Sequence, residues 1–386
     1  MDEQLQQLKT WRRALHERAE TGFQVPETTA YIKARLTEMG YQVERCGRAG
    51  LLAGVGDKTK PCVLLRADID GLPMREKTGL PFACKTDKMH ACGHDMHATM
   101  LLGAAKLLKA REQKLNVFVK LLFQPAEEIL EGAKDCIEGG VMDEPKPQAA
   151  FALHVSTGGA LKTGTFVLSS REIAAPAADY FTVRVKGKSA HGATPDKGTD
   201  ALVAAAHILL GLQNLPAREQ AVDNPFVLTL GKMQGGSAGN AIADYAEMQG
   251  TLRAYDEDTR ARIKTRVKEI AQGTAKAFQA RASVRFDGGC PTLKNDIRLA
   301  KFAAEQIEEL FGAESVLWTD GRGGGSEDFA YFSHEIPSTL LVLAAGERKD
   351  GYEYPLHHPK TEFDEAALAV GSKLLAELII KGAGMR

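Results

Sequence analysis

Short, almost uninterrupted apolar runs alternate along the first part of the chain with segments whose apolar residues recur at helical spacing. The clearest runs are 61–67, 116–123 and 149–153, and helical segments fall between them at about 96–111 and 131–138. A strand that is apolar on both faces must be covered on both sides, which is typical of a parallel sheet packed between helices. The alternation therefore predicts an α/β domain with a mostly parallel sheet flanked by helices.

A different pattern occupies residues 175–290. In order, it predicts a strand at 179–186, a helix at 197–214, strands at 226–232 and 243–254, a helix at 256–279 and a strand at 282–287. The order β-α-β-β-α-β is the ferredoxin-like split arrangement. Because the first pattern resumes at 295, we expect one domain from residues 1–174 and 291–386, with an α+β domain inserted at 175–290.

The overall composition argues against several classes of protein. The 386 residues have a formal net charge of −1, which offers no electrostatic footprint for nucleic acid or a membrane surface. The first residues lack the apolar segment of a signal peptide, and no apolar run approaches the roughly 20 residues of a membrane helix. The six cysteines are widely spread without a CxxC pair, so no disulfide framework is expected. We therefore expect a cytoplasmic protein without a nucleic-acid or membrane partner.

The densest cluster of potential metal donors lies at residues 90–97, His-Ala-Cys-Gly-His-Asp-Met-His. A random distribution of ten His and six Cys over the chain would not be expected to place three His and one Cys in eight residues. Thiolate, imidazole and carboxylate groups are the usual side-chain ligands of first-row metals. Cys92, Gly93 and His94 are expected at a loop-to-helix junction, where glycine lets the backbone bend so that both donors point at one spot. The cluster favours a metal site; the alternative is a redox thiol beside unrelated surface histidines.

Polar side chains that could share this site directly follow the predicted strands. They are Asp68 after 61–67, Glu127 and Glu128 after 116–123, and His154 after 149–153. In open α/β sheets, sites form in the crevice outside the carboxyl ends of the strands. These side chains are therefore expected to form one pocket with Cys92 and His94.

The adjacent Glu127 and Glu128 follow Pro125 on a predicted tight turn, so their carboxylates should point in different directions. One can then bind a metal while the other accepts a proton from a water molecule, as in a metal-dependent hydrolase. The alternative is a solvated acidic turn. His357 and His358 form the last donor cluster, and from the residues alone either could equally be a surface side chain.

Taken together, these motifs resemble the M20 family of metal-dependent amidohydrolases and peptidases, and most closely its aminoacylases, hippurate hydrolases and auxin-conjugate hydrolases. The resemblance covers nearly the whole chain. The matching segments, in order, are 66–73, 90–95, 124–128, 153–155, 189–195, 240–244, 250–253, 325–329 and 356–359. Several such motifs in the right order are far more specific than any one of them.

The resemblance implies a role for each matching residue of the metal site. Five residues would be metal ligands: Cys92, His94, Glu128, His154 and His357. His357 is preferred over His358 because the family's ligand stands two residues before the proline. Glu127 would be the general base, while Asp68 and Asp95 would contact the metal ligands without binding the metal themselves. Five ligands suit two divalent ions sharing one of them, and Mn²⁺, Zn²⁺, Co²⁺ and Ni²⁺ are all compatible.

For the inserted domain, the resemblance implies a lid and a dimerisation surface. His191, Asn240 and Arg253 match positions that hold the substrate's carboxylate and scissile carbonyl, and His191 would act across a dimer interface. Two departures from the wider family agree with the subfamily: Arg66 replaces a ligating histidine, and the Cys92 and His94 pair replaces a bridging aspartate.

We therefore expect a hydrolase that cleaves the amide bond of N-acyl amino acids, with a metal-activated water as nucleophile, and that forms a homodimer or higher homo-oligomer. The nearest alternative is a peptidase or deacetylase of the same family that acts on dipeptides, N-acetyl-diaminopimelate or aminobenzoyl-glutamate. More remote alternatives are a hydrolase with Cys92 as nucleophile and a non-catalytic metal-binding protein.

Overall fold

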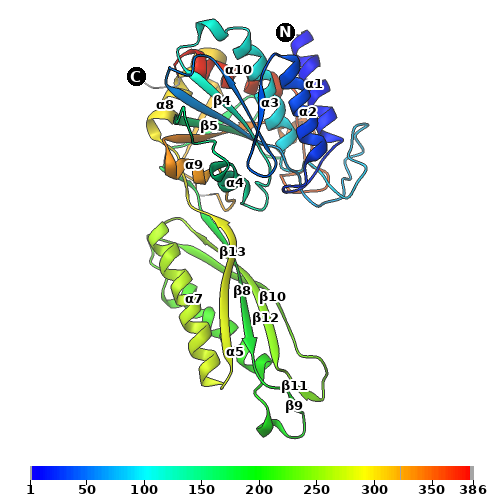
Figure 1. Cartoon of the computed structure of the whole chain (residues 1–386), viewed down its shortest axis with the longest axis vertical. Coiled ribbons are helices and arrows are strands. Elements are labelled where there is room, and N and C mark those ends of the chain that lie inside the picture. Colours follow the sequence, from blue (N-terminus) through cyan, green and yellow to red (C-terminus); the bar gives the residue numbers. More distant parts are fainter. Residues whose placement is uncertain (1, 322, 383–386) are drawn as a thin grey trace. The chain divides into compact units, whose positions relative to one another are not determined.

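The computed structural model describes residues 2–321 and 323–382, which divide into two compact units (Figure 1). Among the described residues, the first unit comprises residues 2–174, 294–321 and 327–382. The second unit comprises Ala175–Leu293 and a short segment that ends at Ser326. Each unit has its own buried apolar core.

An eight-stranded mixed sheet with strand order β1-β2-β4-β3-β5-β16-β6-β15 forms the centre of the first unit. Its strands are β1 (Val43–Cys46), β2 (Gly50–Val55), β3 (Cys62–Asp68), β4 (Phe118–Gln124), β5 (Pro147–Ser156), β6 (Phe166–Ser169), β15 (Val316–Thr319) and β16 (Ser338–Ala344). The four central strands, β4, β3, β5 and β16, are parallel to one another. The mostly parallel sheet predicted from the apolar runs is confirmed.

Helices cover both faces of this sheet. On one face lie α1 (Asp2–His16), α2 (Pro26–Glu38), α3 (His94–Lys109), α8 (Ile297–Phe311) and α10 (Ala367–Ile380), and the short α4 (Gly132–Glu138) and α9 (Ala330–Glu335) lie on the other. Strand residues alternate between the two faces. Val63, Leu65 and Ala67 of β3 belong to the large apolar core, whereas Arg66 donates to Asp328 just before α9.

The second unit is a four-stranded antiparallel sheet with strand order β10-β12-β8-β13. Its elements are β8 (Ala177–Lys186), β9 (Ala190–His191), α5 (Ala201–Leu212), α6 (Asn214–Arg218), β10 (Phe226–Gly235), β11 (Ala241–Ile242), β12 (Tyr245–Ala254), α7 (Glu257–Ala277) and β13 (Arg281–Cys290). Alternate residues of β8, such as Phe181 and Val183, pack in one core with Ile263 and Val267 of α7. The predicted ferredoxin-like order is confirmed.

Two short strands, β7 (Ile173–Ala175) and β14 (Leu293–Lys294), lie where the chain passes between the units. Among the residues that the structure describes, no helix combines the length and the apolar character that a membrane crossing requires.

Candidate metal centre

The carboxyl ends of β3, β4 and β5 lie at one edge of the parallel sheet and position the candidate site. β3 ends at Asp68, and β4 ends three residues before Glu127. The apolar run 149–153 predicted that His154 follows the strand. This prediction is wrong, because β5 continues to Ser156 and His154 lies within it. The strand is longer because residues 154–156 pair with Val342–Ala344 of the neighbouring parallel strand β16.

Gly93 shapes the junction between the donor-rich loop and α3. Its φ of 85° is left-handed, and a Cβ atom there would collide with the side chain of Val155. Only glycine fits both requirements without strain. The bend brings Sγ of Cys92 to 3.5 Å from Nε2 of His154, and α3 begins at His94 with that imidazole fully buried.

Six potential donors converge at this edge: Cys92, His94, Glu127, Glu128, His154 and His357. They form three overlapping groups whose donor atoms lie within 4.8 Å of one another. The groups are Cys92 with His94 and His154, Cys92 with Glu128 and His357, and His94 with Glu127 and Glu128. Cys92, His94 and Glu128 each belong to two of the three groups, and the structure brings together every ligand suggested by the sequence.

His357, and not His358, faces the cluster. Its backbone N–H donates to the carbonyl of Ala91 at 3.0 Å, and its Nε2 lies 3.5 Å from Oε2 of Glu128. Its φ of 62° is unusual for a residue with a side chain and is the kind of backbone strain found at functional sites. His358 instead stacks on Tyr354, with ring centres 4.3 Å apart.

Asp70 holds the turn that separates the two glutamates, a role that the sequence reasoning missed. Its carboxylate accepts the backbone N–H of Glu127 at 3.0 Å and that of Glu128 at 3.4 Å. Ala126, just before the pair, has a positive φ of 60°. The only signal in the sequence was the place of Asp70, two residues after Asp68 at the end of a predicted strand.

The two aspartates expected to support the ligands have different partners. Asp68 accepts hydrogen bonds from Arg66 at 2.8 Å and from His97 at 2.5 Å. Asp95 points away from the donors and accepts from Arg12 and His16 of α1, at 2.7 and 2.8 Å. Asp95 therefore ties the first turn of α3 to α1.

Arg66 is the centre of a second buried network that the sequence did not reveal. Its guanidinium donates to Gln124, Asp68, Glu327 and Asp328 at 2.8 to 2.9 Å. Arg66 has no lone pair to offer a metal. At this position the chain therefore has a cation that binds the surrounding acidic side chains.

The donors fit a metal by their spacing and by their missing partners. Nε2 of His94 and Oε1 of Glu128 are buried and have no hydrogen-bond partner, which is costly unless something else satisfies them, whereas Nδ1 of His94 lies 3.5 Å from Oδ1 of Asp70. Nε2 of His94 lies 3.8 Å from both Glu127 and Glu128, too far for a hydrogen bond. Two donors about 2.0–2.3 Å from one tetrahedral ion stand roughly 3.3–3.8 Å apart, a range that includes the 3.5 Å between Cys92 and His154.

Burial controls the protonation of these groups. It raises the pKa of Glu127 well above its ordinary value, with the charges of Glu327 and Glu128 adding to the effect. It raises the pKa of Glu128 to about 7 and lowers that of His154 to about 3. A neutral imidazole has the free lone pair that a metal requires. The cluster thus combines a neutral histidine with carboxylates that a cation would stabilise.

The residues expected to hold the substrate lie in the second unit, at two separate places. His191 in β9 pairs with Ala241 in β11, next to Asn240, and both side chains are exposed. Arg253 in β12 pairs with Ala178 at the start of β8, whereas β9 follows the end of β8 (Figure 1). Nη1 of Arg253 is buried without a hydrogen-bond partner among the described residues.

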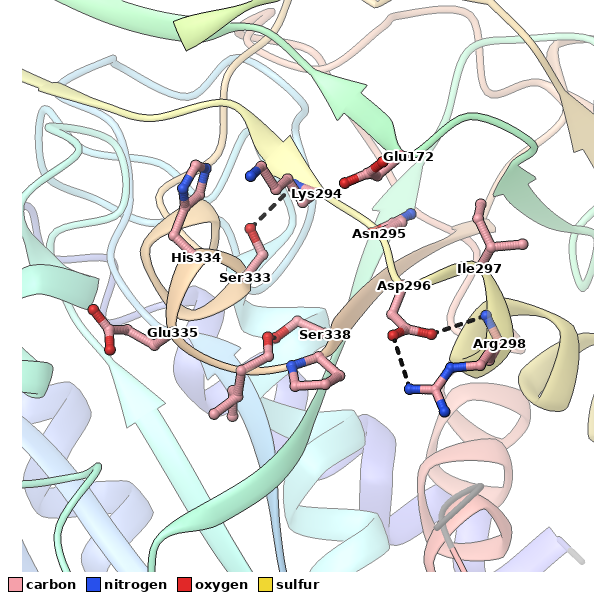
Figure 2. A pocket seen from close by; sticks show the side chains of 12 residues that line it. Glu172, Lys294, Asn295, Asp296, Ile297, Arg298, Ser333, His334, Glu335 and Ser338 are labelled. Carbon is pink, nitrogen blue, oxygen red and sulfur yellow. Dashed lines mark hydrogen bonds and ion pairs between the residues drawn. The ribbon is translucent and has the colours of Figure 1, made fainter. Parts of the chain in front are cut away.

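A hollow of about 420 Å³ lies elsewhere in the first unit (Figure 2). It is lined by Pro337 and Ser338, at the start of β16, and by Asp296 and Ile297, at the start of α8. The candidate donors lie at the opposite, carboxyl ends of the parallel strands. The hollow therefore does not belong to the candidate centre.

A largely buried set of thiolate, imidazole and carboxylate donors near the carboxyl ends of parallel strands, with an adjacent pair of glutamates, is typical of a metal-dependent hydrolase. Residues 64–381 match Peptidase family M20/M25/M40. An N-acetyl-L-cysteine deacetylase of Bacillus subtilis is 36% identical over 95% of this chain and 86% of its own length. The hippurate hydrolase of Campylobacter jejuni is 33% identical over 96% and 95%.

A solved structure extends these similarities to the fold. A dinuclear metal binding peptidase from the M20 family of Bacillus subtilis superposes with a TM-score of 0.81 at 32% identity, covering 99% of each chain. The chain belongs to the M20/M25/M40 peptidase family. The resemblance inferred from the sequence motifs is confirmed, and the protein is a hydrolase that acts on amide bonds.

Proposed function

We propose that the protein hydrolyses the amide bond of N-acyl amino acids. The observation that carries this proposal is the division between the two glutamates: both lie 3.8 Å from His94, but only Glu128 is also grouped with Cys92 and His357. One carboxylate can then bind metal while the other remains available as a base. The names of the two relatives, an N-acetyl-L-cysteine deacetylase and a hippurate hydrolase, both describe cleavage of an N-acylated amino acid.

The five ligands would be Cys92, His94, Glu128, His154 and His357, holding two divalent ions. Cys92, His94 and Glu128 each belong to two of the three donor groups, which supports two ions held close together by overlapping sets of ligands. Bound there, the ions would supply Lewis acids that polarise the substrate carbonyl and lower the pKa of a water molecule. Mn²⁺, Zn²⁺, Co²⁺ and Ni²⁺ all accept these donors, and the thiolate favours the softer ions.

Glu127 would take a proton from the attacking water and deliver it to the leaving amine. Its raised pKa suits this task, because a carboxylate poised to hold a proton is a better base than an exposed one. Cys92 is less suited to be the nucleophile, because burial raises the pKa of its thiol.

Residues 175–290 would act as the lid and dimerisation domain, and 1–174 with 291–386 as the catalytic domain. His191 would stabilise the oxyanion, while Asn240 and Arg253 would hold the substrate. Between Ala178 and Lys186, β8 spans roughly 26 Å at about 3.3 Å per residue. That separation supports a homodimer or higher oligomer, in which His191 of one protomer and Arg253 of its partner serve one site.

A cytoplasmic location is supported by the thiols. Cys46, Cys62, Cys84, Cys92 and Cys136 are all buried and free. Free thiols persist in a reducing compartment.

The proposal is tested with chelated enzyme and a panel of acetyl-, benzoyl- and indoleacetyl-amino acids, alongside dipeptides, N-acetyl-diaminopimelate and aminobenzoyl-glutamate. We expect chelation to abolish hydrolysis, and Mn²⁺, Zn²⁺, Co²⁺ or Ni²⁺ to restore it towards at least one simple N-acyl amino acid. Full activity in enzyme shown by elemental analysis to be metal-free would refute the metal centre. Activity confined to the other three substrate types would refute the proposed substrate class.

A further inference from the structure

Both ring nitrogens of the buried His97 are hydrogen-bonded. Nδ1 lies 2.5 Å from Oδ1 of Asp68, and Nε2 lies 2.8 Å from the backbone nitrogen of Val155. The backbone N–H of Val155 can only donate, so Nε2 must be the unprotonated acceptor. The proton of a neutral ring then resides on Nδ1, which donates it to Asp68.

The peptide contacted by His97 also determines the orientation of His154. Nδ1 of His154 lies 2.7 Å from the carbonyl oxygen of Val155, which can only accept. His154 is therefore protonated on Nδ1, and its unprotonated Nε2 faces Cys92. Val155 thus connects the two histidines: its N–H is held by His97, and its carbonyl selects the tautomer of His154.

His97 also lies close enough to the candidate donors that distance alone would allow it to be a metal ligand. Its ring centre is 4.5 Å from that of His154 and 5.3 Å from that of His94. With Asp68 and His94 it forms a group whose donor atoms lie within 4.8 Å. Coordination by His97 would break one of its two hydrogen bonds and leave a buried partner unsatisfied.

We propose that His97 is a positioning residue that holds Val155 and Asp68 so that His154 presents Nε2 to the metal. This inference rests on the proposed function only in taking His154 as a ligand. His97 lies on α3, Asp68 ends β3 and Val155 lies in β5, so one ring ties together the three elements around the site. Partners that orient a ligand typically change metal affinity by about 10–100-fold.

Two substitutions each remove one of the two hydrogen bonds of His97 and can keep the other. His97→Gln can place an amide oxygen near Nε2 to accept from Val155, but it loses the donor to Asp68. His97→Asn can place an amide N–H near Nδ1, but it loses the acceptor for Val155. We expect His97→Asn to bind metal about 10–100-fold more weakly than wild type and therefore to release it faster to a chelator, and His97→Gln to fall between them. The control His207→Gln removes a histidine that stacks on Phe278 in the second unit and should not change the rate.

The tautomer is measured directly on the full-length, metal-free wild-type protein with ¹⁵N-labelled histidine. Long-range ¹H–¹⁵N spectra should show the ring that is lost in His97→Gln protonated on Nδ1 and unprotonated on Nε2, before and after Zn²⁺ is added. A coordination shift of either nitrogen on adding Zn²⁺ would make His97 a ligand and overturn the proposal. Wild-type release rates in both variants would overturn it as well.

These readouts keep the inference separate from the substrate assignment. The tautomer is observed without metal or substrate, and the release rate without catalysis. If no N-acyl amino acid is hydrolysed, the proposed function fails while a protonated Nδ1 and faster metal release still support His97. If a variant does not fold, the spectra of the wild-type protein decide the question, with the ring assigned from its contacts to Val155.

Discussion

Replacing Asp70 with asparagine tests how the turn at Glu127 and Glu128 is held. The carboxylate accepts one backbone N–H with each oxygen, at 3.0 and 3.4 Å. Asparagine keeps one acceptor oxygen and puts an NH₂ group against the other backbone N–H. A hydrogen bond to a charged group contributes about 1.5–3 kcal/mol. If the loss falls on the transition state, kcat/KM should decrease by about 10- to 160-fold.

The assay compares kcat/KM and bound metal per subunit for wild type and Asp70→Asn at saturating metal. Asp57→Asn is the matched control, because Asp57 also accepts a backbone N–H, from Thr59 at 2.9 Å. Asp57 is exposed and is not one of the candidate donors or their partners. Its kcat/KM should be unchanged. An Asp70→Asn enzyme within twofold of wild type at equal metal loading would refute the reasoning.

Two further predictions concern residues named from the sequence. Glu127→Gln should lower turnover by about 10²–10⁴-fold with near-normal metal content, whereas Glu128→Gln should lose metal; exchanged phenotypes would mean that base and ligand are assigned the wrong way round. Arg253→Lys should lose much of kcat/KM and stop distinguishing an N-acyl amino acid from its C-terminal amide, since an ammonium cannot reproduce the bidentate grip of a guanidinium. Unchanged preference for the acid in both enzymes would exclude Arg253 as the carboxylate anchor.

Much of the fold was predictable because it depends on local patterns. A run such as 116–123 is apolar at nearly every position that a strand buried on both faces needs, Lys120 being the exception within β4, and β4 forms there. Strands of only four residues, such as β1 and β15, lack enough sequence to show a pattern, and pairing with a neighbour creates them. The extension of β5 past His154 has the same cause.

The candidate donors were also predictable, since Cys, His and Glu at strand ends are rare enough to be noticed. Their supporting contacts were not. Asp70 reaches a turn 57 residues away in the sequence, and His97 reaches Val155 across 58 residues. No periodicity encodes such a bond, because it depends on how three separate elements pack.

The amino-acid sequence by itself thus determined which of the longer segments form strands and helices, where the inserted pattern lies and which side chains can bind a metal. Those properties follow from local hydrophobic spacing and from the chemistry of each residue type. Only the tertiary structure showed that His357 lies against Glu128, as the resemblance implied, and that both nitrogens of His97 are already hydrogen-bonded. Distances and hydrogen-bond directions settle such choices, and they exist only after the strands have packed against α3.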